Sequence, residues 1–234
     1  MNRPVKMGIL GGMGPMATSV LYGRIVAHTK ASKDQEHIDM VILSRASLPD
    51  RTAVIKSGDA SAYVEPAVED CLMLEQMGVQ YIAVPCNTAH YFHEAVQARI
   101  HAKLLHMVRE TVRTSGVQTG GKLGIMATDG TVSADVYGRE CRAYGIEPVY
   151  PSEQGQKDVM HLIYDEIKQG KRGDEALFRQ VTDELRQKGC EKIVLACTEL
   201  SYFKEWYELP DDIIDSVDVL VRLFIETSGH EYTE

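Results

Sequence analysis

Apolar positions in the first half of the chain follow two spacings in turn. Short runs of consecutive apolar residues are typical of buried strands, and apolar residues three or four positions apart are typical of helices. Glycine and proline mark the turns between them. The predicted elements are, in order, a strand over Lys6–Leu10, a helix to Thr29, a strand over Met40–Ser44, a loop over Ser47–Thr52, a helix over Tyr63–Met77, a strand over Tyr81–Val84, a helix to Ile100, a strand over Leu104–Met107 and a helix ending near Gly116.

The second half repeats this alternation after the glycine-containing segment Gln118–Gly121. It predicts a strand from Leu123, a helix to Tyr144, a strand over Glu147–Tyr150, helices over Gln154–Lys168 and Asp174–Lys188, a strand ending before Cys197 and a final helix over Val217–Glu226. Strands that alternate with helices favour parallel sheets. We therefore predict an α/β fold with two similar three-layer lobes, one formed by residues 1–117 with the returning C-terminal segment 211–234, the other by residues 118–210.

One stretch occurs in both halves. Tyr81–Thr88 and Lys192–Glu199 are each a short apolar run that ends in a cysteine, and Cys86 and Cys197 lie 111 positions apart. In open α/β sheets, ligands bind beyond the carboxyl ends of the strands. A lone cysteine at a strand end is more often a small core residue, but its duplication favours a functional site with one sulfur from each half.

Composition narrows the class of protein. The chain has 34 acidic and 25 basic residues, a net charge of −9, which makes a nucleic-acid surface improbable. No apolar stretch approaches the roughly 18 residues of a membrane span, and the N-terminus has no signal-peptide pattern, so we expect a cytoplasmic protein. Five cysteines without a close pair predict free thiols.

A thiolate is a competent base when its pKa falls below about 8.5, for example at a helix N-terminus. Both cysteines precede a predicted helix, and we expect a lowered pKa at each. Inverting a carbon that bears a weakly acidic hydrogen requires a base on one face and an acid on the other. Two opposed sulfurs can do both, with hydrogen-bond donors on the substrate carboxylate supplied by Asn87, Thr88, Thr131 and Thr198.

Five motifs resemble the aspartate/glutamate racemase family, most closely its aspartate racemases. They stand in the family's order over nearly the whole chain and comprise Gly11–Pro15, Pro49–Ala53, Pro85–His90, Gln156–Met160 and Cys197–Glu199. The resemblance implies two lobes related by pseudo-symmetry, with the active site in the cleft between them. It also implies reversible racemisation of an acidic amino acid without a cofactor or metal, and a homodimer.

The same resemblance assigns roles to residues. Cys86 and Cys197 are implied as the catalytic pair, and Arg51 and Lys157 as the cations that bind the distal carboxylate of the substrate. The glycine loop at Gly12 and Met13 brings backbone close to the substrate. Weaker hypotheses are that His90 tunes Cys86 and that Glu199 orients or protonates a group near Cys197. Asp129 departs from the family pattern, and we expect its carboxylate to face outward.

Four alternatives remain at this point, and one is a non-catalytic binding protein that would need the Arg51 and Lys157 cations but no reactive thiols. Gly12, Gly14 and Ala17 fit a dinucleotide fingerprint, but Arg45 stands where that fingerprint requires an acidic residue. Cys86, His90 and His93 have the residue types of a metal site. A related two-cysteine isomerase or decarboxylase of another dicarboxylate would use similar thiols.

Overall fold

The computed structural model describes residues 6–234, whose chain divides into two compact units. The first unit runs up to Met107 and resumes from Val217 to Glu234, and the second comprises Val108–Ser216. Each unit contains a four-stranded sheet in which every paired strand is parallel. The strand orders, β2-β1-β3-β4 and β6-β5-β7-β8, are equivalent. The predicted α/β fold with two similar lobes is confirmed.

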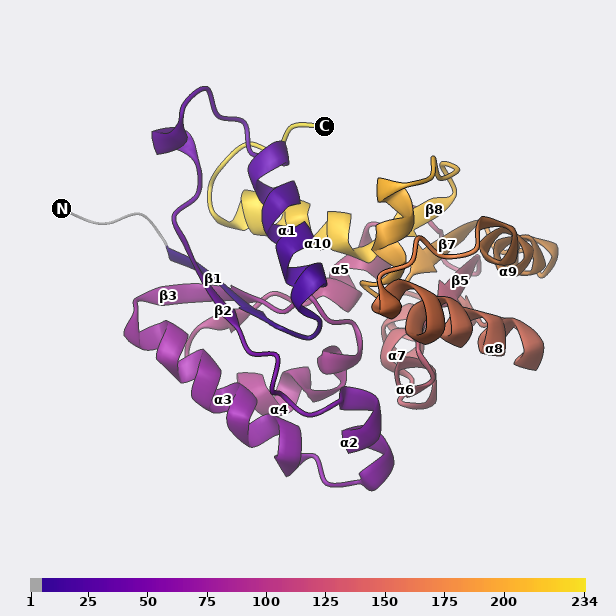
Figure 1. Cartoon of the computed structure of the whole chain (residues 1–234), viewed down its shortest axis with the longest axis horizontal. Helices are drawn as coiled ribbons and strands as arrows, with labels where there is room; N and C mark the ends of the chain where they lie inside the picture. Colours follow the sequence, from indigo (N-terminus) through magenta and orange to yellow (C-terminus); the bar gives the residue numbers. More distant parts are fainter. Residues whose placement is uncertain (1–5) are drawn as a thin grey trace. The chain divides into compact units, whose positions relative to one another are not determined.

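The first unit and the chain that leads out of it contain eleven elements. They are β1 (Lys6–Gly11), α1 (Pro15–His28), η1 (Asp34–Glu36), β2 (Met40–Ser44), α2 (Arg51–Ser57), α3 (Ser61–Gln76), β3 (Val79–Ala83), η2 (Thr88–Phe92), α4 (His93–Gln97), β4 (Lys103–Leu104) and, near the C-terminus, α10 (Ser216–Thr227). Helices cover both faces of the sheet, with α3 and α4 on one face and α1 and α10 on the other (Figure 1).

The alternation of side chains along β1 explains this three-layer arrangement. Met7 and Ile9 pack with Leu21 of α1 and Phe224 of α10, whereas Leu10 packs on the α3 side. Because successive side chains of a strand point to opposite faces, a strand that is apolar throughout has to be covered on both. The C-terminal helix is therefore part of the core of the first unit.

The second unit is built in the same way. Its elements, together with the helix that the chain enters at Met107, are α5 (Met107–Arg113), β5 (Lys122–Met126), α6 (Asp129–Ser133), α7 (Val136–Ala143), β6 (Glu147–Val149), α8 (Glu153–His161), the π-helical turn η3 (Leu162–Glu166), η4 (Ile167–Gln169), α9 (Glu175–Gln187), β7 (Lys192–Leu195), η5 (Leu200–Glu205) and β8 (Ile213–Asp215). Ile193 and Leu195 of β7 pack against α8 and α9, and Val194 packs against α5 and α7.

Three local predictions differ from the structure. The strand expected over Leu104–Met107 ends at Leu104, because Met107 already begins α5. The loop expected over Ser47–Thr52 gives way to α2 at Arg51, because the Asp50 side chain accepts a hydrogen bond from the N–H of Ala53 and caps that helix. The segments that follow Cys86 and Cys197 begin as 3₁₀ turns, η2 and η5, and not as α-helices.

Two elements that the predicted ranges place in the first lobe belong to the second unit in the structure. Both α5 and β8 belong to the second unit. Val108 and Val112 of α5 pack with Leu123 and Ile125 of β5, and β8 pairs with β7 along its length. Packing against the second sheet places α5 in the second unit, and strand pairing places β8 there. No glycine-rich turn in the sequence marks either boundary.

Candidate active site

The glycine loop lies at the carboxyl end of β1, beside the chain that leaves β2. Gly12 has a φ of +90°, and a Cβ there would stand 2.4 Å from the backbone N and C of Arg45. The N–H of Gly12 donates to Thr18 Oγ1 at 2.9 Å, and the N–H of Arg45 donates to the Gly11 carbonyl at 3.1 Å. Only glycine fits this conformation and this close approach.

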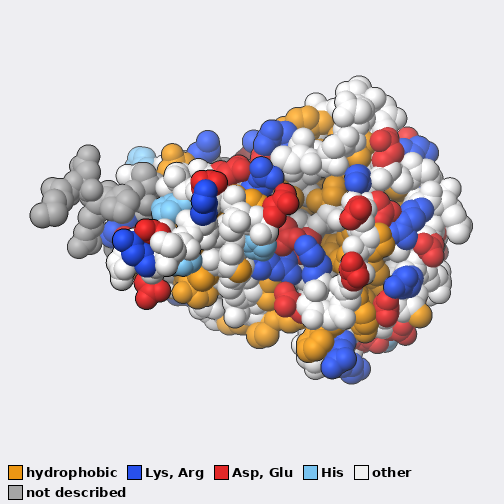
Figure 2. All heavy atoms as spheres, turned by 90° about the horizontal axis from the view of Figure 1, so that it is seen from above, with side chains coloured by type: hydrophobic (Ala, Val, Ile, Leu, Met, Phe, Trp, Pro, Cys, Tyr) orange, Lys and Arg blue, Asp and Glu red, His pale blue; other side chains and the backbone are white. Residues whose placement is uncertain are grey.

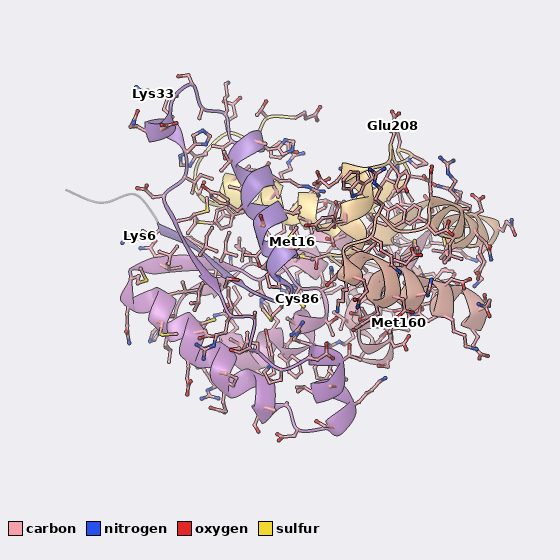
Figure 3. The ribbon with its side chains drawn as sticks, viewed as in Figure 1. Lys6, Met16, Lys33, Cys86, Met160 and Glu208 are labelled. Atoms are coloured by element: carbon pink, nitrogen blue, oxygen red, sulfur yellow. The ribbon has the colours of Figure 1, made fainter. Side chains whose placement is uncertain are left out.

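Cys86 follows β3, the strand next to β1, and Figure 3 labels it at the carboxyl end of this sheet. Its side chain is buried and its thiol is free. Arg51, the first residue of α2, lies close enough for an ionised Cys86 to influence it. Burial disfavours the charged guanidinium, yet the pKa of Arg51 is raised, chiefly by negative charge on Cys86 and then on Tyr63. The first unit thus places a permanent cation beside a thiol.

Arg51 has hydrogen-bonding capacity to spare. Its Nη1 donates to the Pro49 carbonyl at 3.0 Å and its Nη2 to the Met13 carbonyl at 3.5 Å. Its Nε is buried and has no hydrogen-bond partner among residues 6–234. A buried donor without a partner costs free energy that a ligand oxygen can recover. The guanidinium is therefore suited to a carboxylate from outside the chain.

Met13, Asn87 and Thr88 line the same end of the sheet and are buried. The Met13 sulfur accepts a hydrogen bond from the Tyr63 hydroxyl at 3.4 Å. Asn87 precedes η2, but its side chain makes no capping hydrogen bond there. The predicted α-helix N-terminus behind Cys86 is thus wrong in kind, and a short 3₁₀ turn provides a smaller dipole.

Cys197 follows β7 at the equivalent place in the second unit. Its Sγ donates to Glu199 Oε2 at 2.9 Å. Burial raises the pKa of the Cys197 thiol well above its ordinary value, and the charge and hydrogen bond of Glu199 raise it further. This direction is the opposite of the one predicted from the sequence, because the thiol is buried beside a carboxylate.

Glu199 is the centre of a small polar group that comprises its neighbours Thr198, Lys168 and Cys197. The Thr198 hydroxyl donates to Glu199 Oε2 at 3.3 Å, and Lys168 Nζ lies 3.7 Å from Glu199 Oε1. Lys168 also lies 3.9 Å above the Tyr164 ring centroid. Its positive charge lowers the pKa of Cys197, although less than burial and Glu199 raise it.

The two lysines of this region have different surroundings. Lys157, which the family resemblance implies as a substrate cation, is exposed on α8 and pairs at 2.8 Å with Glu153, which is more exposed still. Lys168, which sequence reasoning missed, lies next to Glu199 with its side chain 31% exposed, against 64% for Lys157. The i, i+4 spacing of Tyr164 and Lys168 was the available signal, but nothing in the sequence connects Lys168 with Cys197.

Thr131 and Asp129 lie at the carboxyl end of β5. The N–H of Thr131 donates to Thr128 Oγ1 at 3.3 Å, which caps α6. Asp129 is half-buried, and its Oδ1 accepts from the Gln156 amide at 2.9 Å. Its N–H donates to the sulfur of Met160, labelled on α8 in Figure 3. The carboxylate is thus held by an amide.

For the metal alternative, His90 already has other partners in the structure. Both ring nitrogens of His90 are engaged with backbone groups. Within residues 6–234, no three His, Cys, Asp or Glu side chains are grouped in a way that could hold a metal ion. For the dinucleotide alternative, Arg45 at the end of β2 pairs with the buried Asp70 at 3.3 Å.

The surface is mixed in charge. Figure 2 shows acidic and basic side chains interspersed on the face that it presents, so the net charge of −9 is not gathered there in one patch. Among the described residues, no helix combines the length and apolar character that crossing a membrane requires.

The fold and the site together define a two-lobed α/β protein with one buried thiol beside charged side chains at the carboxyl edge of each sheet. Residues 10–224 match the profile of the Asp/Glu/hydantoin racemase family, and the chain belongs to that family. The resemblance found in the sequence motifs is thereby confirmed.

The chain is also similar to one curated relative and to two solved structures. It is 28% identical over 227 residues to the broad specificity amino-acid racemase RacX of Bacillus subtilis, covering 94% of this chain and 97% of that one. It is 27% identical to the aspartate racemase structure of Picrophilus torridus, with a TM-score of 0.79 over 98% and 96% of the two chains. The glutamate racemase RacE1 of Bacillus anthracis shares the fold, at 16% identity and a TM-score of 0.63 over 98% and 82%.

Proposed function

We propose that this chain is a cofactor-independent racemase that interconverts the L and D forms of aspartate, and of glutamate, with Cys86 and Cys197 as its two acid–base groups. The observation that carries the proposal is the duplicated buried cysteine with charged neighbours, Arg51 at one and Glu199 with Lys168 at the other. Membership of the racemase family and likeness to an aspartate racemase support it.

In this mechanism one sulfur is a thiolate and the other a thiol, on opposite sides of the substrate α-carbon. The thiolate takes the α-hydrogen as a proton and becomes a thiol. The electron pair left on the α-carbon is delocalised into the carboxylate, and the second thiol gives its proton to the opposite face. At the end of one turnover the two sulfurs have exchanged their protonation states, and the reverse reaction restores them.

The neighbours of the cysteines support a starting assignment. Cys86 lies beside the permanently charged Arg51. The Cys197 thiol donates to Glu199, which keeps its proton in place. In the free protein Cys86 is then the base and Cys197 the acid.

The cations set the substrate class. The unpartnered Nε of Arg51 suits one carboxylate of the substrate, and a second cation is needed for the other. The family resemblance assigns Lys157 to the distal carboxylate together with Arg51, whereas Lys168, whose side chain is less exposed and lies near Glu199 and Cys197, is the cation that we favour for the other carboxylate. Two carboxylates and two cations would make a dicarboxylic amino acid the preferred substrate.

The test is incubation of the purified protein in deuterated water with each enantiomer of aspartate and of glutamate. We expect loss of optical activity from both enantiomers, with one deuterium entering the product at the α-carbon. Release of carbon dioxide, or a change of skeleton without α-exchange, would instead identify the related two-cysteine isomerase or decarboxylase.

A wider substrate range is favoured by one of the relatives. RacX is named a broad specificity amino-acid racemase. Neutral amino acids should therefore be included in the same assay, and comparable turnover of one of them would contradict the dicarboxylate preference. The homodimer implied by the family stays a prediction, which light scattering of the purified chain tests.

A further inference from the structure

A buried imidazole in the first unit joins the chain at Cys86 to the chain that leaves the unit. His90 is 5% exposed. Its Nδ1 lies 2.9 Å from the Cys86 carbonyl oxygen. The backbone N–H of Met107, the first residue of α5, donates to its Nε2 at 3.1 Å. One side chain thus makes hydrogen bonds to the backbone of two residues, Cys86 and Met107, that lie 21 positions apart along the chain.

These contacts fix the tautomer of His90. Because Nε2 accepts the Met107 N–H, it carries no proton, and the proton of the neutral ring is on Nδ1, from which it is donated to the Cys86 carbonyl. The Leu105 carbonyl, 3.4 Å from Nε2, is then a neighbour and not an acceptor. Burial lowers the pKa of His90 to about 4, so the ring stays neutral at physiological pH.

With the hydrogen bond from His90, both backbone polar groups of Cys86 are hydrogen-bonded. The N–H of Cys86 donates to the Val84 carbonyl at 2.8 Å, and its C=O accepts from His90. With both backbone groups held, the sulfur keeps only the rotation about its own Cα–Cβ bond. Buried packing around Cys86 restricts that rotation as well.

We propose that His90 is a positioning residue for Cys86, which holds the thiol in its acid–base position by donating from Nδ1 to the Cys86 carbonyl. The inference rests on the proposed function, because it concerns the Cys86 half of the racemisation. It acts on Cys86 alone and leaves Cys197, in the other unit, unaffected.

Two substitutions separate the two bonds of the imidazole. His90→Asn keeps a donor near the place of Nδ1 and loses the acceptor for Met107. His90→Gln keeps an acceptor near the place of Nε2 and loses the donor for Cys86. Each variant loses one hydrogen bond of the same kind, so both should be destabilised to a similar extent, which thermal unfolding checks.

The readout is the half-reaction of one cysteine. A Cys197→Ala background cannot racemise but still exchanges the α-hydrogen of one enantiomer with deuterated water through Cys86, and a Cys86→Ala background exchanges that of the other through Cys197. We expect His90→Gln to slow the Cys86-dependent exchange on the order of tenfold to a hundredfold, since a displacement of about 1 Å costs a rate of that size. His90→Asn should keep most of it, and neither should change the Cys197-dependent exchange.

The neighbouring imidazole provides the control. His93 bonds to the Leu104 carbonyl at 3.3 Å, so His93→Gln should leave both half-reactions unchanged. Equal losses for His90→Asn and His90→Gln, or equal losses in the two backgrounds, would reduce His90 to a residue of general stability and overturn the proposal.

A second measurement is independent of racemase activity. Iodoacetamide alkylation of Cys86, followed by mass spectrometry across a pH series, reports the state of the thiol in any folded variant. We expect His90→Gln to change the rate and pH midpoint at Cys86, and His90→Asn to preserve both. If no single-cysteine background exchanges any substrate, the proposed function fails, while unchanged alkylation of Cys86 in His90→Gln would refute the role of His90.

Discussion

Cys86 and Cys197 have charged neighbours of opposite sign. Cys86 lies beside Arg51, and Cys197 donates to Glu199. A cation favours the thiolate and an anion the thiol. A racemase with two cysteines needs one of each at the start of every turnover, so this asymmetry is useful before any substrate binds.

Replacing Glu199 by Gln tests this at Cys197. The carboxylate charge is the largest contribution after burial to the raised pKa of Cys197, so the variant should bring that pKa down. The rate of Cys197 alkylation should then rise at lower pH than in the parent protein, measured by mass spectrometry. Glu208→Gln, at an exposed acidic residue labelled in Figure 3, is the matched control. An unchanged Cys197 profile in Glu199→Gln would show that burial alone sets the proton affinity.

We expect substitutions of Lys168 and Lys157 to have different effects on substrate binding. Lys168→Ala removes the cation next to Glu199 and should raise the KM for aspartate about tenfold to a hundredfold, because a charged hydrogen bond contributes roughly 1.5–3 kcal/mol. Lys157→Ala removes an exposed ion pair and should change KM less than about threefold. Steady-state kinetics in both directions decides between them, and the reverse pattern would restore Lys157 as the substrate cation.

At the scale of elements, the loop after β1 and the end of β2 form one rigid unit. Gly12 lies so close to the Arg45 backbone that a side chain would not fit between them. The Arg45 side chain pairs with Asp70, a buried residue of α3. The loop then passes Met13, whose carbonyl accepts from Arg51. Contacts between three elements thus hold the backbone at the start of α2, whose first residue is Arg51.

Gly12→Ala should therefore destabilise the protein by more than about 2 kcal/mol, since a Cβ meets backbone at 2.4 Å and the positive φ is itself unfavourable. Denaturant unfolding measures the change. Gly23→Ala in α1 is the control, because its Cβ meets nothing within 4 Å. That substitution should be neutral or stabilising by up to about 1 kcal/mol. Equal effects of the two would show that the loop adapts to a side chain.

At the scale of the whole molecule, both sheets have the same strand order and carry their cysteine after the third strand of each set. The first unit, however, contains a buried histidine that spans from Cys86 to the start of α5, where the chain passes into the second unit. Protonating His90 would remove the acceptor at Nε2 and place a charge in the core. The stability of the fold is therefore linked to pH.

The sign of this linkage follows from the lowered pKa. His90 binds a proton with a pKa of about 4 when folded and 6.5 as an ordinary histidine, so the unfolded chain binds more protons between these values. Its contribution is complete above pH 6.5 and is lost as the pH falls towards 4, by about 3 kcal/mol in all. Unfolding free energies from pH 4 to 7 should show this slope, and His90→Asn should reduce it. His101→Gln, at an exposed histidine, is the control, and an unchanged slope in His90→Asn would contradict the assignment.

Several local features were predictable because a few neighbouring residues determine them. The apolar run Met40–Ser44 is β2 as predicted, since a short apolar run has clear ends even though β2 lies at the edge of its sheet and is only partly buried. The duplicated cysteine motif, with its position beyond a buried strand, was equally readable. Asp50 as a helix cap was available in the sequence, but the proline before it favoured a loop.

The sequence by itself determined the alternation of strands and helices, the two related halves and the identity of the two thiols, because these depend on spacing and residue type along the chain. Only the tertiary structure decided which charges stand next to each sulfur, as with Arg51 and Glu199, and that Lys168 rather than Lys157 lies near Cys197. It also decided that His90 bonds Cys86 to Met107. Burial and proximity between distant segments arise from packing, and packing sets the proton affinities on which the proposed chemistry depends.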